Sequence, residues 1–162
     1  MKSLRLWAGL GILGLLAALG SLVLSGAQEA GERGFRGGSY LTTITDSTGN
    51  FASRGVMTLH ADQTVSATDS NQNGPDFFFT SQLGSWRPAG NRRIVAKTLD
   101  FDLPPNTNDV ARLNYNILLS PDHRQIAGTV TLSTFPLQGG DPINGQGTLI
   151  GTFNFTGEWI RP

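Results

Sequence analysis

The feature that most constrains the fold is a series of short segments, from Gly38 onward, in which apolar and polar residues alternate. Alternation with a period of two places one set of side chains on each face of a β-strand. The clearest case lies within residues 110–120, where one face carries Ala111, Leu113, Tyr115, Ile117 and Leu119. No segment after residue 28 has a helical period. The chain is therefore predicted to form an all-β domain with one buried face.

The spacing of these segments predicts eight strands, at about residues 39–46, 54–61, 64–69, 77–87, 92–102, 110–120, 125–135 and 148–160. Turn-type sequences at 61–63, 88–91 and 120–123 connect consecutive strands tightly, which indicates a meander. An open meander would leave two unpaired edges, and closure removes them. We therefore expect an eight-stranded antiparallel up-and-down barrel behind an N-terminal signal segment. The interior of such a barrel is either filled by side chains or holds one small ligand.

The first 27 residues have the organisation of an export signal. Lys2 and Arg5 precede an uncharged run from residue 6 to residue 24, and Ser25-Gly26-Ala27 offers small residues for cleavage. The alternative is an uncleaved anchor, since the run is just long enough to span a bilayer. The sequence thus predicts a signal peptide at 1–27, a flexible leader at 28–37 and a barrel domain at 38–162. It also predicts an exported protein, periplasmic or extracellular, that contacts a membrane only through an uncleaved N-terminal segment.

Composition excludes several functional classes. The chain has 12 basic and 12 acidic residues, and loss of Lys2 and Arg5 with the signal leaves the acidic ones in slight excess, which argues against nucleic-acid binding. There is no Cys, so disulfides, thiol catalysis and Cys-containing metal sites are excluded. Only His60 and His123 are available as histidine ligands, and neither lies in a nucleophile–base–acid pattern. We therefore expect no catalytic residue, metal or cofactor.

A resemblance to a known family rests on two short motifs. Gly84-x-Trp86 and the degenerate Gly38-Ser39-Tyr40 resemble the Gly-x-Trp signature of lipocalin-like, or calycin-type, small secreted β-barrels. The better match lies on the fourth expected strand, whereas lipocalins carry the signature on the first, and the C-terminal helix and disulfides of that family are absent. The resemblance implies a barrel that binds a ligand in its interior.

The leading hypothesis is an exported, non-enzymatic barrel that binds a small, largely apolar ligand in its interior. Within Phe77-Phe78-Phe79, the middle ring points away from its neighbours, so one aromatic residue is expected at the rim, where a ligand would enter. The expected ligand-binding residues are Tyr40, Phe78, Trp86, Tyr115 and Phe153.

Two further functions stay open. One is a structural or protein-interaction module of the cell envelope with a filled barrel. The other is a cavity-based isomerase or cyclase that uses His60 or a carboxylate as acid or base, which a strongly perturbed titrating group in the cavity would favour.

Three local patterns have both a functional and a structural interpretation. Arg92 and Arg93 could place a guanidinium over the indole of Trp86, or the Trp could be a core residue between solvated arginines. Residues 69–74 match the first half of a calcium loop but are expected to form a polar loop, because the second half fails. Asp100 and Asp102 share a strand face, and could bind a cation jointly, but are expected to be solvated.

Overall fold

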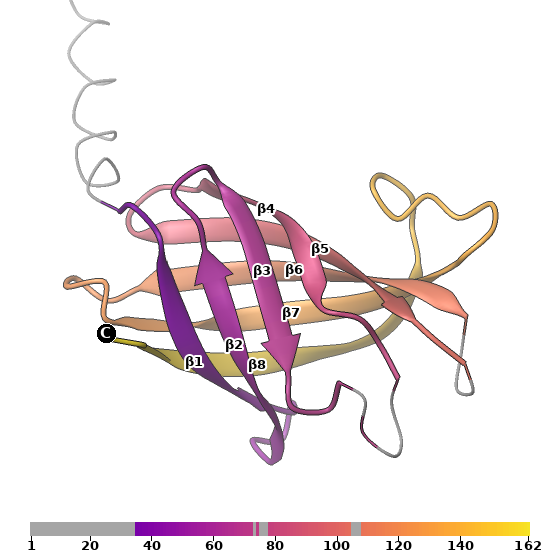
Figure 1. Cartoon of the computed structure of the whole chain (residues 1–162), viewed down its shortest axis with the longest axis horizontal. Helices are drawn as coiled ribbons and strands as arrows, with labels where there is room; N and C mark the ends of the chain where they lie inside the picture. Colours follow the sequence, from indigo (N-terminus) through magenta and orange to yellow (C-terminus); the bar gives the residue numbers. More distant parts are fainter. Residues whose placement is uncertain (1–34, 73, 75–77, 105–107) are drawn as a thin grey trace, which may run out of the picture.

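The computed structural model describes residues 35–72, 74, 78–104 and 108–162. Eight antiparallel strands form a closed barrel in chain order (Figure 1), which confirms the predicted fold class. The strands are β1 (Gly38–Thr45), β2 (Phe51–Leu59), β3 (Thr64–Asp69), β4 (Gln82–Pro88), β5 (Arg93–Asp102), β6 (Asp109–Leu119), β7 (Gln125–Pro136) and β8 (Thr148–Trp159). In the described part of the chain, no helix is long and apolar enough to cross a membrane. The predicted export segment at 1–27 lies outside the described residues.

The barrel closes through an antiparallel ladder between the first and last strands. Tyr40 lies opposite Trp159, and Thr45 lies opposite Asn154. Every strand consequently pairs on both sides, and no long edge is left to pair with another chain.

Two strand starts differ from the prediction by more than two residues. β4 begins at Gln82 rather than at residue 77, because a side chain interrupts the ladder. The backbone amide of Thr80 donates to Phe101 O at 3.0 Å, but the amide of Phe101 donates to the Thr80 hydroxyl at 3.0 Å instead of to a carbonyl. Only an isolated bridge between Phe79 and Asp102 continues the pairing. β2 begins earlier than expected, at Phe51, whose ring is 66% exposed and therefore does not continue the apolar alternation.

The three predicted hairpin turns are present. The backbone amides of Gln63, Arg93 and His123 each donate to the carbonyl three residues earlier, at 2.9–3.1 Å. Gln63 and His123 adopt positive φ angles of 68° and 58°, as tight hairpin turns require.

The inward face follows the predicted alternation. Its most deeply buried apolar side chains are Tyr40, Leu59, Val65, Ile117, Ile126 and Val130. Gly128 lies between two of these positions, and a Cβ there would overlap the carbonyl oxygen of Asn116 on β6. The space left by the missing side chain is therefore occupied by the backbone of β6, and the close approach of β6 and β7 requires glycine here.

The connection between β7 and β8 folds over the outside of the barrel (Figure 1, upper right). Arg112 on β6 points outward and donates to Pro142 O at 3.1 Å and to Gly145 O at 2.9 Å. Its guanidinium also lies 4.6 Å from the centre of the Phe135 ring. These contacts fix the connection against the barrel wall near one end.

Candidate functional site

The end of the barrel at which β1 begins and β8 ends is filled by aromatic side chains, and we call it the closed end. Phe35, just before β1, makes edge-to-face contacts with Trp86 at 5.6 Å and with the His123 ring at 5.4 Å. The space left among these residues is about 20 Å³, which suits at most a water molecule.

The polar atoms of the closed end have partners. Trp86 Nε1 donates to His60 O at 2.9 Å, and the hydroxyl of Tyr40 donates to His123 O at 2.8 Å. Burial raises the pKa of Tyr40 to about 12, so this hydroxyl stays protonated. Trp86 is thus a core residue, packed against Phe35 instead of a guanidinium, and Arg92 donates to Leu119 O at 2.9 Å. The interpretation of Trp86 as a core residue is confirmed.

The opposite end of the interior, called the polar end, contains hydrogen-bonding side chains from β3, β4, β5 and β6. The hydroxyl of Tyr115 donates to Gln82 Oε1 at 2.6 Å, and the hydroxyl of Thr98 donates to the same oxygen at 3.2 Å. All three side chains are buried. Burial raises the pKa of the Tyr115 hydroxyl above its ordinary value, and the negative charge of Asp100 adds a smaller increase.

Asp100 is the unusual member of the polar end. It follows Thr98 on the inward face of β5 and is only 4% exposed. Its Oδ1 has no hydrogen-bond partner among the described residues. Burial raises the pKa of this carboxyl to about 7, and the charges of Asp102 and Asp69 add to the effect. The prediction that this carboxylate is solvated is wrong, because the barrel wall turns it inward.

Two neighbouring carboxyls differ in how well they are compensated. Asp69 on β3 accepts hydrogen bonds from the Ser53 hydroxyl at 2.7 Å and from the backbone amide of Asn71 at 2.8 Å. Asp102 has a pKa raised by burial and by the charge of Asp109. Asp69 also begins the predicted half-match to a calcium loop, of which residue 73 lies outside the described residues. Among the residues described, no group of three or more His, Asp or Glu side chains is arranged to hold a metal ion.

Apolar side chains face the same part of the interior. Ile44, Leu113 and Phe153 are partly buried and pack against the core cluster. Leu113 lies directly opposite Thr98 in the β5–β6 register, so it is a diagonal neighbour of Asp100. These side chains point into a closed barrel and yet keep some exposure. These three side chains therefore form partly exposed apolar surface beside the polar end.

The structure separates the five predicted ligand-binding residues. Tyr40 and Trp86 belong to the filled closed end. Tyr115 and Phe153 both lie opposite Val130, one on each side of β7, and so face the interior next to the polar end. Phe78 lies at the rim, 43% exposed.

Sequence reasoning missed Gln82 and Thr98, and it missed the burial of Asp100. The sequence did contain a signal for Thr98 and for the burial of Asp100. Ile94 and Ala96 alternate as inward residues on the fifth strand, and the same alternation continues to Thr98 and Asp100.

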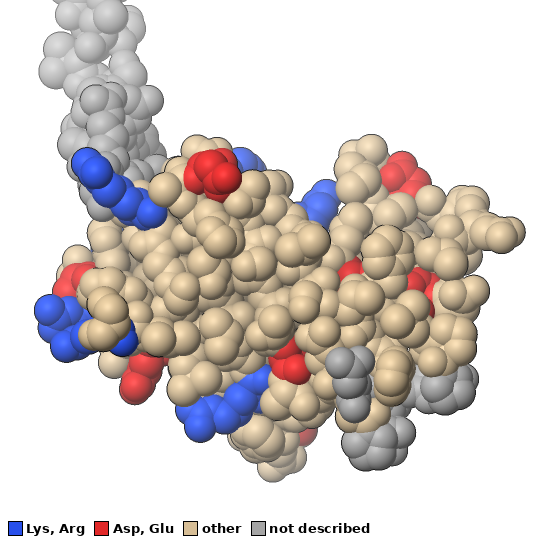
Figure 2. Space-filling view, viewed as in Figure 1, with Lys and Arg blue, Asp and Glu red and all other residues tan. Residues whose placement is uncertain are grey.

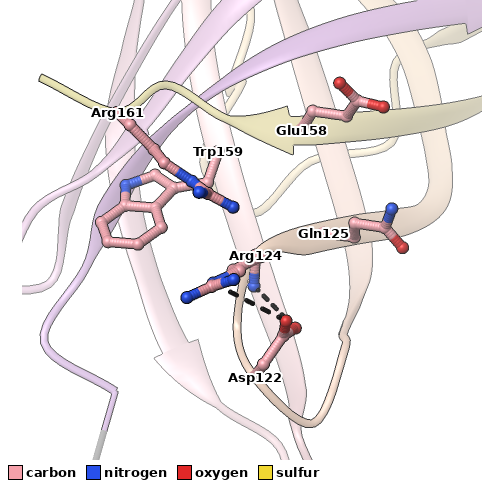
Figure 3. A pocket seen from close by; sticks show the side chains of 6 residues that line it. All are labelled: Asp122, Arg124, Gln125, Glu158, Trp159 and Arg161. Carbon is pink, nitrogen blue, oxygen red and sulfur yellow. Dashed lines mark hydrogen bonds and ion pairs between the residues drawn. The ribbon is translucent and has the colours of Figure 1, made fainter.

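A surface groove of about 600 Å³ lies outside the barrel near the closed end, lined by Asp122, Arg124, Gln125, Glu158, Trp159 and Arg161. Figure 3 shows the two arginines and Trp159 on one side of this groove, with Gln125 and Glu158 on the other. The ion pair between Arg124 and Asp122 measures 3.8 Å and is exposed. Because these side chains are open to solvent, the groove lacks the desolvation of the polar end.

Charge is distributed unevenly between the two ends. Exposed arginines gather at the closed end: Arg36, Arg87, Arg92, Arg93, Arg124 and Arg161. In Figure 2, the half of the visible face toward the β7–β8 connection shows acidic side chains and little basic charge. Among the described residues, the polar end carries six acidic side chains, Asp46, Asp69, Asp100, Asp102, Asp109 and Asp141, together with the exposed Arg54 on β2.

These features define a closed, eight-stranded, antiparallel up-and-down barrel, an architecture consistent with that of lipocalin-like proteins. Comparison of the chain with protein-family models, with curated proteins and with solved structures found no match. The polar end, with its buried and unpartnered carboxyl, is therefore the candidate functional site.

Proposed function

We propose that this protein is an exported carrier that binds a small, largely apolar molecule at the polar end of the barrel interior. The observation that carries the proposal is the buried carboxyl of Asp100, whose Oδ1 lacks a partner among the described residues. A buried polar atom without a partner costs free energy, and a ligand that donates a hydrogen bond removes that cost.

The surroundings of Asp100 support a ligand with an apolar body. Leu113, Ile44 and Phe153 offer inward apolar surface that is partly exposed. Binding sites for small molecules generally combine such surface with a few placed polar groups. The resemblance to lipocalin-like barrels implies the same role, and the filled closed end would make the polar end the entrance.

A substitution that fills the interior tests this proposal. Leu113→Trp adds bulk beside Asp100, whereas Leu118→Trp adds the same bulk on the outer face of the same strand, where Leu118 is exposed. The protein and both variants are purified from the producing cells and compared by native mass spectrometry before and after denaturing extraction, with circular dichroism as a check of folding. We expect a small molecule to accompany the unmodified protein and the Leu118 variant, and to be lost from the folded Leu113 variant.

If no form carries a small molecule and none binds hydrophobic probe dyes, the carrier proposal is wrong, and a filled structural or protein-interaction module becomes the better proposal.

A second candidate function is favoured by one observation. A carboxyl with a pKa of about 7 inside the barrel can both accept and donate a proton near neutral pH, as general acid–base catalysis requires. The cavity-based isomerase or cyclase would use Asp100 in this role. Chromatography of the extracted ligand after incubation with the protein distinguishes catalysis from carriage, since an isomerase changes the retention of its ligand without changing its mass.

A further inference from the structure

We propose that the polar end selects ligands that carry an organic cation, an ammonium group attached to an apolar body, and that Asp100 binds the ammonium. This inference rests on the proposed carrier function and specifies the chemistry of its ligand. It depends on the geometry of the carboxyls, on the lack of a compensating base and on the apolar surface beside them.

Asp100 is a buried hydrogen-bond acceptor. Only 4% of its surface is exposed, and its Oδ1 has no partner among the described residues. Because Asp100 continues the inward series of β5 after Thr98, the carboxyl faces the interior. A buried acceptor without a donor is the complement of a ligand that brings donors, and an ammonium brings three.

The ionisable groups that face Asp100 come from β3, β5 and β6. The ionisable side chains around Asp100 are Asp69 on β3, Asp102 on its own strand and Tyr115 on β6. The charge of Asp109, on β6, acts in turn on Asp102. The inward neighbours on β4 and β2, Gln82 and Ser53, are uncharged.

No cation among the described residues compensates this group. Arg112, on the neighbouring strand, points outward and donates to the carbonyls of Pro142 and Gly145. Lys97 also points outward, and its ammonium donates to Ile143 O at 2.7 Å. A ligand cation would supply the positive charge that the chain directs elsewhere, and charge-assisted hydrogen bonds are stronger than neutral ones.

Apolar side chains beside Asp100 favour an organic cation over a metal ion. Leu113 lies diagonally across from Asp100, and Ile44 and Phe153 line the same part of the interior. Apolar surface beside a carboxylate matches an amphiphilic cation, whose hydrocarbon part gains by leaving water. A hydrated metal ion would gain nothing from that surface. The negative field at this end also attracts cations from solution.

The test compares probes that differ only in their polar group. 1-Naphthylmethylamine and 1-naphthalenemethanol form one matched pair, and cyclohexylmethylamine and cyclohexylmethanol form another. Binding to the purified protein is measured by isothermal titration calorimetry at about pH 8. Asp100→Asn removes the charge and keeps the size, and Asp122→Asn, at an exposed turn of the closed end, is the matched control.

We expect each amine to bind at least 10-fold more tightly than its alcohol, and Asp100→Asn to abolish that preference while Asp122→Asn preserves it. In the unmodified protein, amine affinity should fall about 100-fold between pH 8 and pH 5, because only about one Asp100 in a hundred is ionised two pH units below its pKa of about 7. Alcohol affinity should change much less. This pH profile supplies the test independently if the Asp100 variant does not fold.

Three results would overturn the inference. If amines and alcohols bind with equal affinity, the carrier function stands and the selection of cations is wrong. If none of the four probes binds to any form, the selection of cations is wrong, and the native mass spectrometry described above decides separately whether the carrier function fails. If calcium chloride alone binds in a manner that depends on Asp100, the polar end is a metal site.

Discussion

Replacing Asp100 by Asn should remove a pH-dependent penalty from the stability of the fold. In the folded protein, burial raises the pKa of Asp100 to about 7 from an ordinary value of 3.8. Between these two pH values, the folded state keeps a proton that the unfolded state releases. The free energy of unfolding therefore decreases as pH rises through this window, and the full penalty is present above about pH 7.

The difference between the two pKa values corresponds to about 4 kcal/mol. The slope is at most about 1.4 kcal/mol per pH unit for a single proton. Because Asn does not titrate, the free energy of unfolding of Asp100→Asn relative to the unmodified protein should increase by up to about 4 kcal/mol from about pH 4 to about pH 8. If the Asn side chain itself destabilises the fold, it does so equally at every pH. The plot of the difference in free energy of unfolding against pH then shifts as a whole and keeps its slope.

Urea unfolding followed by tryptophan fluorescence measures this difference at each pH, since the ring of Trp86 is buried in the folded state. Asp122→Asn is the control. Asp122 is exposed, and hydrogen bonds from Ser120 and Arg124 lower its pKa, so its contribution to stability is lost only as pH falls below the ordinary carboxyl range. Its substitution should leave the curve from pH 5 to pH 8 unchanged.

Two results would refute the reasoning. One is a difference between Asp100→Asn and the unmodified protein that stays constant within about 0.5 kcal/mol over the whole range, since one displaced titration must produce a slope. The other is a carboxyl ¹³C titration in which no Asp signal of the folded protein moves near pH 7.

Three other substitutions test the packing. Gly128→Ala should destabilise the barrel by about 1–3 kcal/mol or prevent folding, because its Cβ would overlap Asn116 O; urea unfolding measures this. Phe35→Ala should lower stability by about 1–3 kcal/mol, because the closed end loses its cover; with Trp7 and Trp159 replaced by Phe, it should also shift the remaining emission of Trp86 to longer wavelength, and unchanged emission would contradict the packing described. Arg112→Lys should speed proteolysis of the β7–β8 connection, since Lys cannot maintain both carbonyl contacts in the same geometry; limited digestion with mass mapping checks this.

Periodicity was sufficient to predict the barrel but not the contents of its interior. On β6, strict alternation marks Tyr115 and Ile117 as inward, and both are buried as expected. At the start of β4, the ladder depends on a Thr80 hydroxyl that takes the place of a carbonyl, and no pattern of apolar residues contains that information.

The candidate site was predicted less well than the fold, for a physical reason. An Asp near a strand end is normally solvated, so composition argued against burial of Asp100. Its burial depends on the curvature of the sheet: β3, β4 and β5 pair in order, and they curl so that Asp69, Gln82 and Asp100 share one interior. Aromatic residues were the more obvious candidates, but Tyr40 and Trp86 fill the closed end and satisfy their polar atoms there.

The two ends of the barrel differ in how well their buried polar atoms are satisfied. At the closed end, the side-chain polar atoms of Tyr40 and Trp86 each have a hydrogen-bond partner, so their burial carries no penalty from an unsatisfied polar atom. At the polar end, Asp100 costs about 4 kcal/mol above neutral pH, a large part of the roughly 5–15 kcal/mol that stabilises a typical domain. A Leu or Asn at this position would avoid the ionic penalty. Departures from local stability of this kind are expected at functional sites. The unpartnered carboxyl of Asp100 therefore favours the polar end, rather than the aromatic closed end, as the proposed ligand site.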